Sequence, residues 1–403
     1  MKKWTGLGLA LLLGTALAGA PVPAAAELKV GISGYVKLDI QYGDKLTGEL
    51  HSPGPSATPL DTDPVRDNSQ TIVDARQSRL RATFTDEVAG IKFSGRIETD
   101  FYTRDAGDTP GLATSNSARL RLRHAFARAD HPSGFFVLAG QFFSSFMNDT
   151  IAQPELVDFN GPAGQVFNAR QPQLRVGYRT PLAPGMGDLM VEADVEKHFT
   201  SNLGTFATPP GDPINEARGE GQTIPLFAGK ISWLHPRFQA EVAGAIGESK
   251  VILDATGADA SETAWGGQVS AQTNVLDPVT VFAHFQVNKG LGRLLNADFA
   301  DAVVVGSSLE NIETIGWYAG AKYQVTPETS INGVFGWHQA DEIAAGGFTG
   351  ASLETHQSIH VNVIHKFWQR WQAGLEYRRF DVEAFNGTDG DVNFVHGALW
   401  FFF

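Results

Sequence analysis

The chain has 403 residues, a formal net charge of −13 and no cysteine, which excludes a disulfide-stapled domain and thiolate metal sites. The acidic balance excludes a strongly basic face for nucleic acid. Charged residues make up 19% of the chain, yet beyond the N-terminus no stretch approaches the roughly 20 apolar residues of a membrane helix, which excludes a helical membrane protein.

The N-terminus predicts a secretory signal peptide. Two lysines precede an apolar run over residues 7–18, and small residues with an Ala24-x-Ala26 pattern follow it. The run is too short to cross a bilayer as a helix. We therefore expect cleavage after Ala26, which removes residues 1–26. Residues 27–403 contain no linker or shift in composition and are expected to form one architecture.

The first segment after the signal peptide alternates between apolar and polar side chains. Val36, Leu38 and Ile40 lie on one face of an extended chain, and Lys37 and Asp39 lie on the other. The alternation continues for about a dozen residues. This is long for a soluble strand and suits a tilted membrane strand of roughly 9 to 11 residues.

The same alternation recurs along the rest of the chain and predicts about sixteen strands. The further strands are expected near residues 75–85, 91–104, 118–130, 135–143, 170–179, 188–197, 225–235, 237–248, 263–274, 279–289, 314–325, 329–339, 356–367, 371–380 and 391–403. An even number of strands is the rule for bacterial single-chain barrels, because both chain ends then emerge on the periplasmic side.

The connections between these strands alternate in length. Tight turns are expected at residues 86–90, 131–134, 234–236, 276–278, 326–328 and 368–370. Longer polar segments are expected to form loops at residues 43–74, 144–169, 197–224 and 290–313. Short periplasmic turns and long extracellular loops are typical of outer-membrane barrels, and a soluble sandwich has no reason to alternate in this way.

The segment over residues 91–102 indicates what lies on each side of the sheet. Phe93 and Ile97 share one face, and Arg96 and Glu98 share the other. In lipid every backbone donor and acceptor must be paired within the sheet, so the apolar face can meet hydrocarbon only if the sheet closes. The sequence therefore predicts an all-β, transmembrane antiparallel barrel in the bacterial outer membrane, with lipid outside and water inside.

Aromatic residues gather beside the expected turns and strand ends. The set comprises Phe135, Phe136, Trp233, Phe238, Trp368, Trp371 and Trp400. Such residues form girdles at the two interfaces of a membrane barrel, which is the prediction here. The alternative is that they are ordinary core aromatics.

The last expected strand closes an alternating apolar row with Leu399, Phe401 and the terminal Phe403. This arrangement resembles the C-terminal signature of outer-membrane barrels, in which the terminal aromatic strand is read by the insertion machinery. The resemblance implies that Phe403 serves as the insertion signal and that this machinery is a partner of the chain.

Arginines recur on the polar faces of the early strands and once on a later one. They are Arg79, Arg81, Arg96, Arg119, Arg121, Arg123 and Arg175. Arginine stays ionised and presents a planar fork of donors, so a ladder of arginines in a pore wall attracts anions and grips carboxylates. The alternative is that Glu98 and Asp100 neutralise the arginines, which would leave a solvated wall without preference.

The segment over residues 153–170 is richer in apolar residues than a solvated loop, and we expect it to fold inward. It belongs to the third long connection, at about residues 144–170, and so resembles the third extracellular loop that narrows general porins. Glu155 and Asp158 would then face the arginines and create a transverse field, with Asn160 in the turn. The alternative is a surface loop that packs over a neighbouring subunit.

Several segments resemble the DcaP-like porin family: SGYVKLD, ARQSRLR, RIETDFY, RLRHAF, GQFFSSF, PELVDFNGP and RQPQLR. The resemblance is densest over residues 31–180 and then thins to the barrel pattern alone. It implies a homotrimer and the uptake of dicarboxylic acids. It further implies lumen roles for Arg79, Arg81, Arg119, Arg121 and Arg123, and constriction roles for Glu155 and Asp158.

These features predict a porin for passive diffusion of small hydrophilic solutes, with a preference for anions such as dicarboxylates and with no cofactor, metal or energy source. One alternative is a monomeric channel for hydrophobic or aromatic compounds, which usually needs an N-terminal hatch. Another is an outer-membrane lipid-modifying enzyme, and a third is an adhesin. No G-x-S-x-G, H-E-x-x-H or phosphate-loop motif supports an enzyme, and His124 is expected on an outward position without a serine partner.

Overall fold

The computed structural model describes residues 28–48, 51–102, 118–167, 169–198, 222–252, 259–295, 299–305, 308–341 and 352–403. The expected signal peptide, residues 1–26, lies outside the described residues. In the described part of the chain, no helix is long and apolar enough to cross a membrane.

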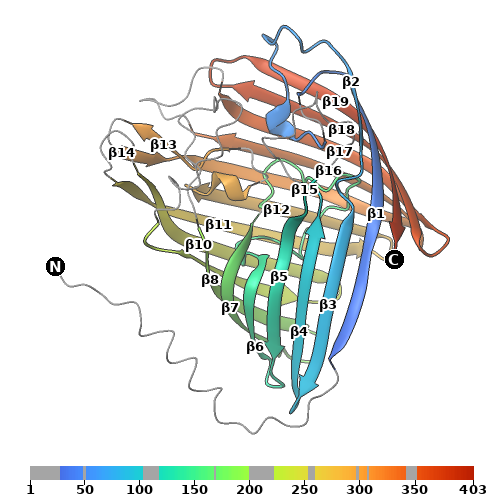
Figure 1. The fold of residues 1–403 in the computed structure, drawn as a ribbon, viewed down its shortest axis with the longest axis vertical. Helices are drawn as coiled ribbons and strands as arrows, with labels where there is room; N and C mark the ends of the chain where they lie inside the picture. The colour runs from blue at the N-terminus through green and yellow to red at the C-terminus, as the bar shows by residue number, and fades with distance from the viewer. Residues whose placement is uncertain are drawn as a thin grey trace.

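Nearly all regular structure is antiparallel β-sheet (Figure 1). The strands are β1 (Lys29–Gly43), β2 (Gln70–Asp74), β3 (Arg79–Val88), β4 (Ile91–Asp100), β5 (Arg121–Asp130), β6 (Phe135–Phe143), β7 (Arg170–Pro181), β8 (Asp188–Glu196), β9 (Leu226–Leu234), β10 (Phe238–Ile252), β11 (Asp259–Leu276), β12 (Val279–Lys289), β13 (Ala302–Val305), β14 (Ser308–Asn311), β15 (Glu313–Thr326), β16 (Thr329–Ala340), β17 (Leu353–Phe367), β18 (Trp371–Ala384) and β19 (Asp389–Phe402). Two short 3-10 helices, η1 (Pro55–Ala57) and η2 (Gly292–Leu294), lie in loops.

The sheet closes on itself, since β1 pairs with the last strand, β19, on one side and with β2 and β3 on the other. Figure 1 shows the blue first strand beside the red last strands. Because β2 and β3 both pair with β1, they act as two parts of one strand, and the described residues form a closed barrel of sixteen strands. The predicted fold class and strand number are confirmed.

The second barrel strand differs from the prediction, which placed one continuous strand at residues 75–85. The strand stops at Asp74 and resumes at Arg79, and between them the Ser78 backbone N–H donates to the Ala75 carbonyl at 3.0 Å in a turn. The interruption leaves Gln77 buried beside the interior.

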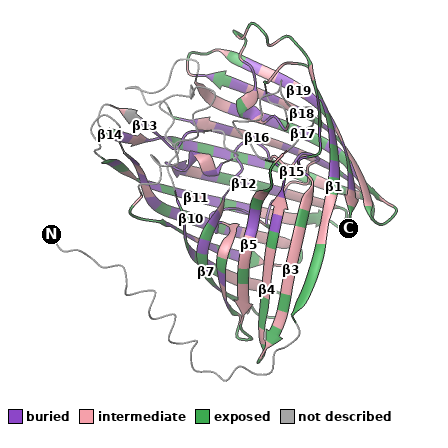
Figure 2. Ribbon diagram, in the orientation of Figure 1, coloured by how far each residue is buried: buried purple, intermediate pink, exposed green. Residues whose placement is uncertain are grey.

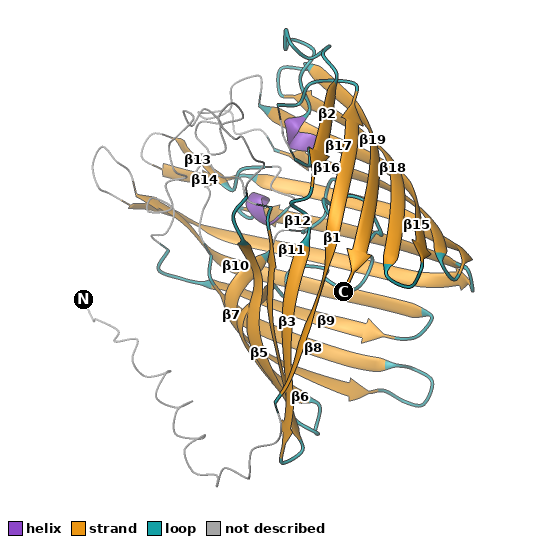
Figure 3. Ribbon diagram, turned by 45° about the vertical axis from the view of Figure 1, so that its right-hand side comes forward, coloured by secondary structure: helices purple, strands orange, loops and turns teal. Residues whose placement is uncertain are grey.

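Most connections have the predicted alternation of lengths, and the exception is the short connection at residues 385–388 between β18 and β19. Figure 3 shows short turns at one end of the barrel and longer loops at the other. By the usual rule for such barrels, the short turns mark the periplasmic end. A further short turn, between Pro181 and Asp188, was not among the predicted turns.

Burial along the strands alternates in the reverse sense to a soluble protein. On β1 the apolar Val36 is 56% exposed and Leu38 44%, whereas Lys37 and Asp39 are almost fully buried. Figure 2 shows this alternation of buried and exposed residues around the barrel. Apolar side chains therefore cover the outer wall, where a closed sheet leaves no backbone group unpaired against lipid. This is the wall expected of a β-barrel that spans a membrane.

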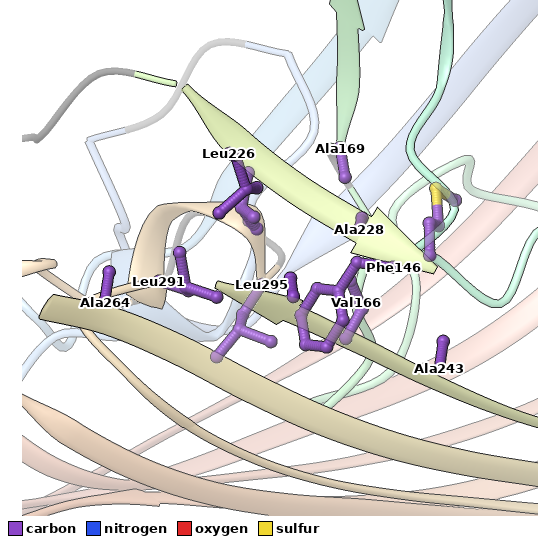
Figure 4. Packing of buried hydrophobic residues seen from close by; sticks show 12 residues of the cluster. Phe146, Val166, Ala169, Leu226, Ala228, Ala243, Ala264, Leu291 and Leu295 are labelled. Atoms are coloured by element: carbon purple, nitrogen blue, oxygen red, sulfur yellow. The ribbon is translucent and has the colours of Figure 1, made fainter. Parts of the chain in front are cut away.

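Loops rather than a sheet-on-sheet core fill the upper interior. Phe146 and Val166 from the connection between β6 and β7 pack against Leu291 and Leu295 from the connection between β12 and β13 (Figure 4). Ala228, Ala243 and Ala264, small residues of β9, β10 and β11, belong to the same buried cluster. Because alanine projects little into the lumen, the wall leaves room for an inserted loop.

The girdle prediction is wrong for two of its aromatic residues. Phe135 and Trp368 are exposed on the outside, but Phe136 and Trp400 are buried in the interior. The Phe136 ring lies over Gly177, where a Cβ atom would meet the ring at 2.3 Å. The side on which these two rings lie follows from the alternation of side chains along the strand and not from their position beside a turn.

Candidate pore constriction

One inner wall of the barrel carries a cross-strand ladder of opposite charges. Arg79 lies directly opposite Asp100, and Arg81 lies opposite Glu98. On the next strand Arg121 again lies opposite Asp100. Directly opposed residues of an antiparallel pair point to the same face, so β3, β4 and β5 place these five side chains together. We call Arg79, Arg81, Arg121 and Arg123 the arginine wall.

Glu98 and Asp100 are shared among all four arginines of this wall. Glu98 accepts hydrogen bonds from Arg81 Nε at 2.8 Å and Arg123 Nε at 2.9 Å, and Arg79 Nη1 lies 3.5 Å from it. Asp100 accepts from Arg121 at 2.7 Å and 2.8 Å and from Arg123 at 2.8 Å. Four positive charges thus meet two negative ones.

The arginines of this wall are more exposed to the lumen than the two carboxylates that pair with them. The side chains of Arg81 and Arg121 are 32% and 27% exposed, whereas the two carboxylates are only 2% and 3% exposed. The guanidinium groups therefore reach the water of the lumen, and the carboxylates lie behind them. A solute passing this wall meets positive charge first.

A β-bulge at Arg123 explains the position of His124. In the ladder between β4 and β5, Glu98 pairs with His124 and Thr99 with Leu122, so Arg123 is an extra residue without a partner position. The bulge shifts the phase and puts His124 on the same face as Glu98. The predicted outward position of His124 is therefore wrong. Its ring contacts Phe126, Phe142 and Phe143 instead.

The other predicted arginines lie in different places. Arg96 is on the same face of β4, opposite Thr83 and Phe126, and no described carboxylate lies within ion-pair distance of it. Arg119 is exposed just before β5. Arg175 lies on β7 away from the wall, where it is 3% exposed and holds Glu192 at 3.0 Å and Asp194 at 3.3 Å.

Arg170 adds a positive charge that the sequence did not single out. It is the first residue of β7, its charge is buried near those of Arg121 and Arg123, and its Cζ lies 5.9 Å from the centre of the Phe143 ring. Within the described part of the chain it has no carboxylate partner. Its place at the end of an apolar loop was the available signal, because that loop returns it to the barrel mouth.

The connection between β6 and β7 lies inside the barrel in its described residues, 144–167 and 169, and we call it loop 3. The Tyr318 hydroxyl donates to the Ala152 carbonyl at 2.8 Å. The Ala163 N–H donates to Ser358 Oγ at 2.9 Å. These partners belong to the inner faces of β15 and β17. Loop 3 therefore packs on the wall formed by β15 to β18.

The carboxylates of loop 3 pair with bases on the wall that the loop covers, in contrast to the predicted transverse field. Glu155 pairs with Lys322 of β15 at 2.5 Å, and Asp158 pairs with Arg378 of β18. We expected both to face the arginine wall, and this expectation is wrong. A carboxylate under a packed loop is stable only when paired, and the nearest bases are on the covered wall.

Asp158 is held ionised by its surroundings. Burial by itself would raise its pKa, but Arg378, His396 and Lys37 outweigh this effect and hold the pKa well below its usual range. The Asp158 carboxylate also accepts the Asn160 N–H at 3.1 Å, which forms the predicted turn.

The tip of loop 3 reaches across to the arginine wall. The Phe159 ring lies 4.6 Å from the Tyr102 ring, and the Arg121 guanidinium lies 5.8 Å from the Phe159 ring centre. The arginine wall and loop 3 thus bound the same part of the interior.

Neither a protein-family model nor a curated protein matches this sequence. Several solved structures match its fold. The outer membrane channel DcaP of Acinetobacter baumannii has a TM-score of 0.73 at 22% identity, over 96% of this chain and 100% of that one. An anion-selective porin from Comamonas acidovorans has a TM-score of 0.58 at 13% identity, over 94% and 100%. OmpT of Vibrio cholerae in a trimer form has 0.57 at 11%, over 93% and 99%.

At these identities the likeness concerns the fold. The residues that suggested a DcaP-like porin agree with it, since SGYVKLD, RIETDFY and RLRHAF supply β1, β4 and β5 beside the constriction. The chain is an outer-membrane β-barrel with the fold of porins, similar to the DcaP channel over almost its whole length.

Proposed function

We propose that the protein is a porin through which small hydrophilic solutes diffuse passively, with a preference for anions. The observation that carries this proposal is the unequal sharing of charge at the constriction, where four arginines meet two carboxylates. Arg96 and Arg170 add positive charge without a described carboxylate partner. The loop 3 carboxylates Asp149, Glu155 and Asp158 pair with bases of β9, β15 and β18, so none of them cancels this excess.

The magnitude of the effect is sufficient for selectivity. Two unit charges about 4 Å apart interact by about 1 kcal/mol in water, which changes the local anion concentration about fivefold. Inside a narrow lumen the effective dielectric constant is lower and the effect is larger. The anion-selective porin from Comamonas acidovorans, which has a similar fold, supports this direction.

Dicarboxylates fit the arrangement of the arginine wall better than single anions do. Arg81 and Arg121 are both partly exposed and belong to strands on either side of β4. Each guanidinium can hold one carboxylate by two hydrogen bonds. We propose that the two carboxylates of a dicarboxylate contact Arg81 and Arg121 separately, whereas a monocarboxylate contacts one of them.

We further propose a homotrimer that is inserted through recognition of the terminal strand. A trimer form exists for the similar OmpT of Vibrio cholerae. Phe403 follows directly after β19 and exchanges two backbone hydrogen bonds with Gly34, both of 3.1 Å, and its ring is exposed. The residue is therefore accessible for recognition at the seam where the barrel closes.

Reversal potentials across a planar bilayer in a salt gradient test the anion preference. The unmodified protein is expected to favour chloride over potassium, and Arg121→Ala is expected to reduce this preference severalfold. Arg179→Ala is the control, because Arg179 is 55% exposed and pairs with Asp188 beside a short turn. Cation selectivity that Arg121→Ala leaves unchanged would remove the anion claim.

A further inference from the structure

The tip of loop 3 is anchored to β18 by a buried ion pair. Arg378 is fully buried, and its guanidinium donates to Asp158 Oδ2 and, at 2.5 Å, to Gln41 Oε1. Its Cζ also lies 5.0 Å from the Phe394 ring centre. Asp158 is equally buried. Neither group has access to water as an alternative partner.

The same carboxylate accepts hydrogen bonds from two other parts of the chain. The Ser52 hydroxyl, from the connection between β1 and β2, donates to Asp158 Oδ2. The Gln77 side chain, from the interruption between β2 and β3, donates to Oδ1 at 3.1 Å. The ion pair with Arg378 therefore joins loop 3, the β1–β2 connection, the β2–β3 interruption and β18 at one point.

The residue before Asp158 is also fixed at both backbone groups. The Val157 N–H donates to Glu376 Oε2 at 2.9 Å, and the Lys37 ammonium donates to the Val157 carbonyl at 2.7 Å. The residue after Asp158 points the other way, because Phe159 contacts Tyr102 and approaches Arg121. A displacement of Asp158 must therefore shift the surface that loop 3 presents to the arginine wall.

We propose that Arg378 is a positioning residue that sets the gap between loop 3 and the arginine wall, and so the width of the channel. This inference rests on the proposed function as a pore. Arg378 touches no solute and acts through Asp158 and Phe159. Its removal leaves a buried carboxylate with insufficient positive charge, which drives the loop tip toward water.

The other ion pairs of loop 3 do not fill this role. Glu155 and Lys322 are 33% and 35% exposed, so water replaces their contact at little cost. Asp149 pairs with Lys230 of β9 at 2.6 Å, near the beginning of the loop and far along the chain from the tip. Only Asp158 combines a place at the tip with full burial of both partners among the described ion pairs of this loop.

The experiment compares Arg378→Met with Arg379→Met. Arg379 is the next residue on β18, faces outward and forms a half-exposed pair with Asp381. Single-channel conductance and the exclusion of neutral polyethylene glycols of graded size are measured. We expect Arg378→Met to raise conductance roughly twofold, as for a doubled open cross-section, and to admit larger polymers. Arg379→Met should change neither quantity.

A double variant separates positioning from general damage. Replacing both partners by apolar side chains leaves no unpaired buried charge. The channel of the double variant Arg378→Met with Asp158→Leu should therefore have a lower conductance and a smaller polymer limit than that of Arg378→Met alone. Heat-modified electrophoretic mobility verifies that each variant is a folded barrel. A folded Arg378→Met channel with the parent's conductance and polymer limit overturns the proposal, as does an equal change in Arg379→Met.

A labelling readout makes the result independent of conduction. The chain has no cysteine, so Asn160→Cys introduces a single thiol at the loop tip. We expect a bulky maleimide to label it severalfold faster in the Arg378→Met background. If the unmodified protein forms no pore, the proposed function fails. An unchanged labelling rate in the Arg378→Met background overturns the positioning role of Arg378, whatever the conductance.

Discussion

At the scale of single residues, Glu98 has the largest consequence because it serves three arginines at once. Glu98→Gln removes a buried negative charge and leaves guanidinium groups without their partner. We expect a stronger anion preference in reversal-potential measurements and a loss of about 3 to 5 kcal/mol of stability. An unchanged preference in a folded channel would show that solutes do not pass this wall.

The room available for a side chain at two glycines is a second determinant of stability at the residue scale. A Cβ on Gly177 would lie 2.3 Å from the Phe136 ring, whereas a Cβ on Gly267 would meet nothing within 4 Å. Gly177→Ala should therefore lower stability by about 1 to 3 kcal/mol through overpacking, and Gly267→Ala should have little effect. Urea unfolding in detergent or vesicles measures both, and equal losses would contradict the argument.

At the scale of elements, loop 3 should keep its position over a wide pH range. The pKa of Asp158 is held well below its usual range, so its stabilisation is complete above the ordinary aspartate range and is lost only as pH falls through the depressed value. Conductance should therefore change little between about pH 7 and about pH 5. A marked rise in conductance within that interval, abolished by Asp158→Asn, would contradict a pKa of Asp158 well below its usual range.

The sequence predicts the strands well and the irregularities poorly. Alternation along residues such as Val36 and Leu38 is a local property, so β1 and the other long strands could be predicted from it. The break between Asp74 and Arg79 and the bulge at Arg123 depend on partners in other strands. No local sequence pattern predicts either irregularity. The bulge at Arg123 places His124 on the inner face.

The candidate site could be predicted in part for the same reason. Residues two apart share a face, so the arginine wall followed from spacing alone. The partners of Glu155 and Asp158 did not, because Lys322 and Arg378 come from strands far along the chain. Spacing gives the face of a strand, but it does not give the wall against which an inserted loop will pack.

At the scale of the whole molecule, the outer wall must tolerate lipid. Leu38→Arg places a charge on the exposed apolar face of β1 and should cost about 2 to 4 kcal/mol if it lies near the bilayer midplane. Val65→Arg is the control, since Val65 is equally exposed but lies in a loop outside the barrel strands. Folding yields into vesicles compare the two, and equal yields would contradict a lipid-facing wall at Leu38.

The central claim is that a closed barrel brings an excess of arginine to the part of the lumen that loop 3 faces. Swelling of liposomes that contain the purified protein tests it most directly, with a short dicarboxylate compared against a diamine of the same length. The account predicts faster swelling with the dicarboxylate and a smaller difference at high salt, because salt screens the arginine wall. Equal rates, or faster entry of the diamine, would contradict it.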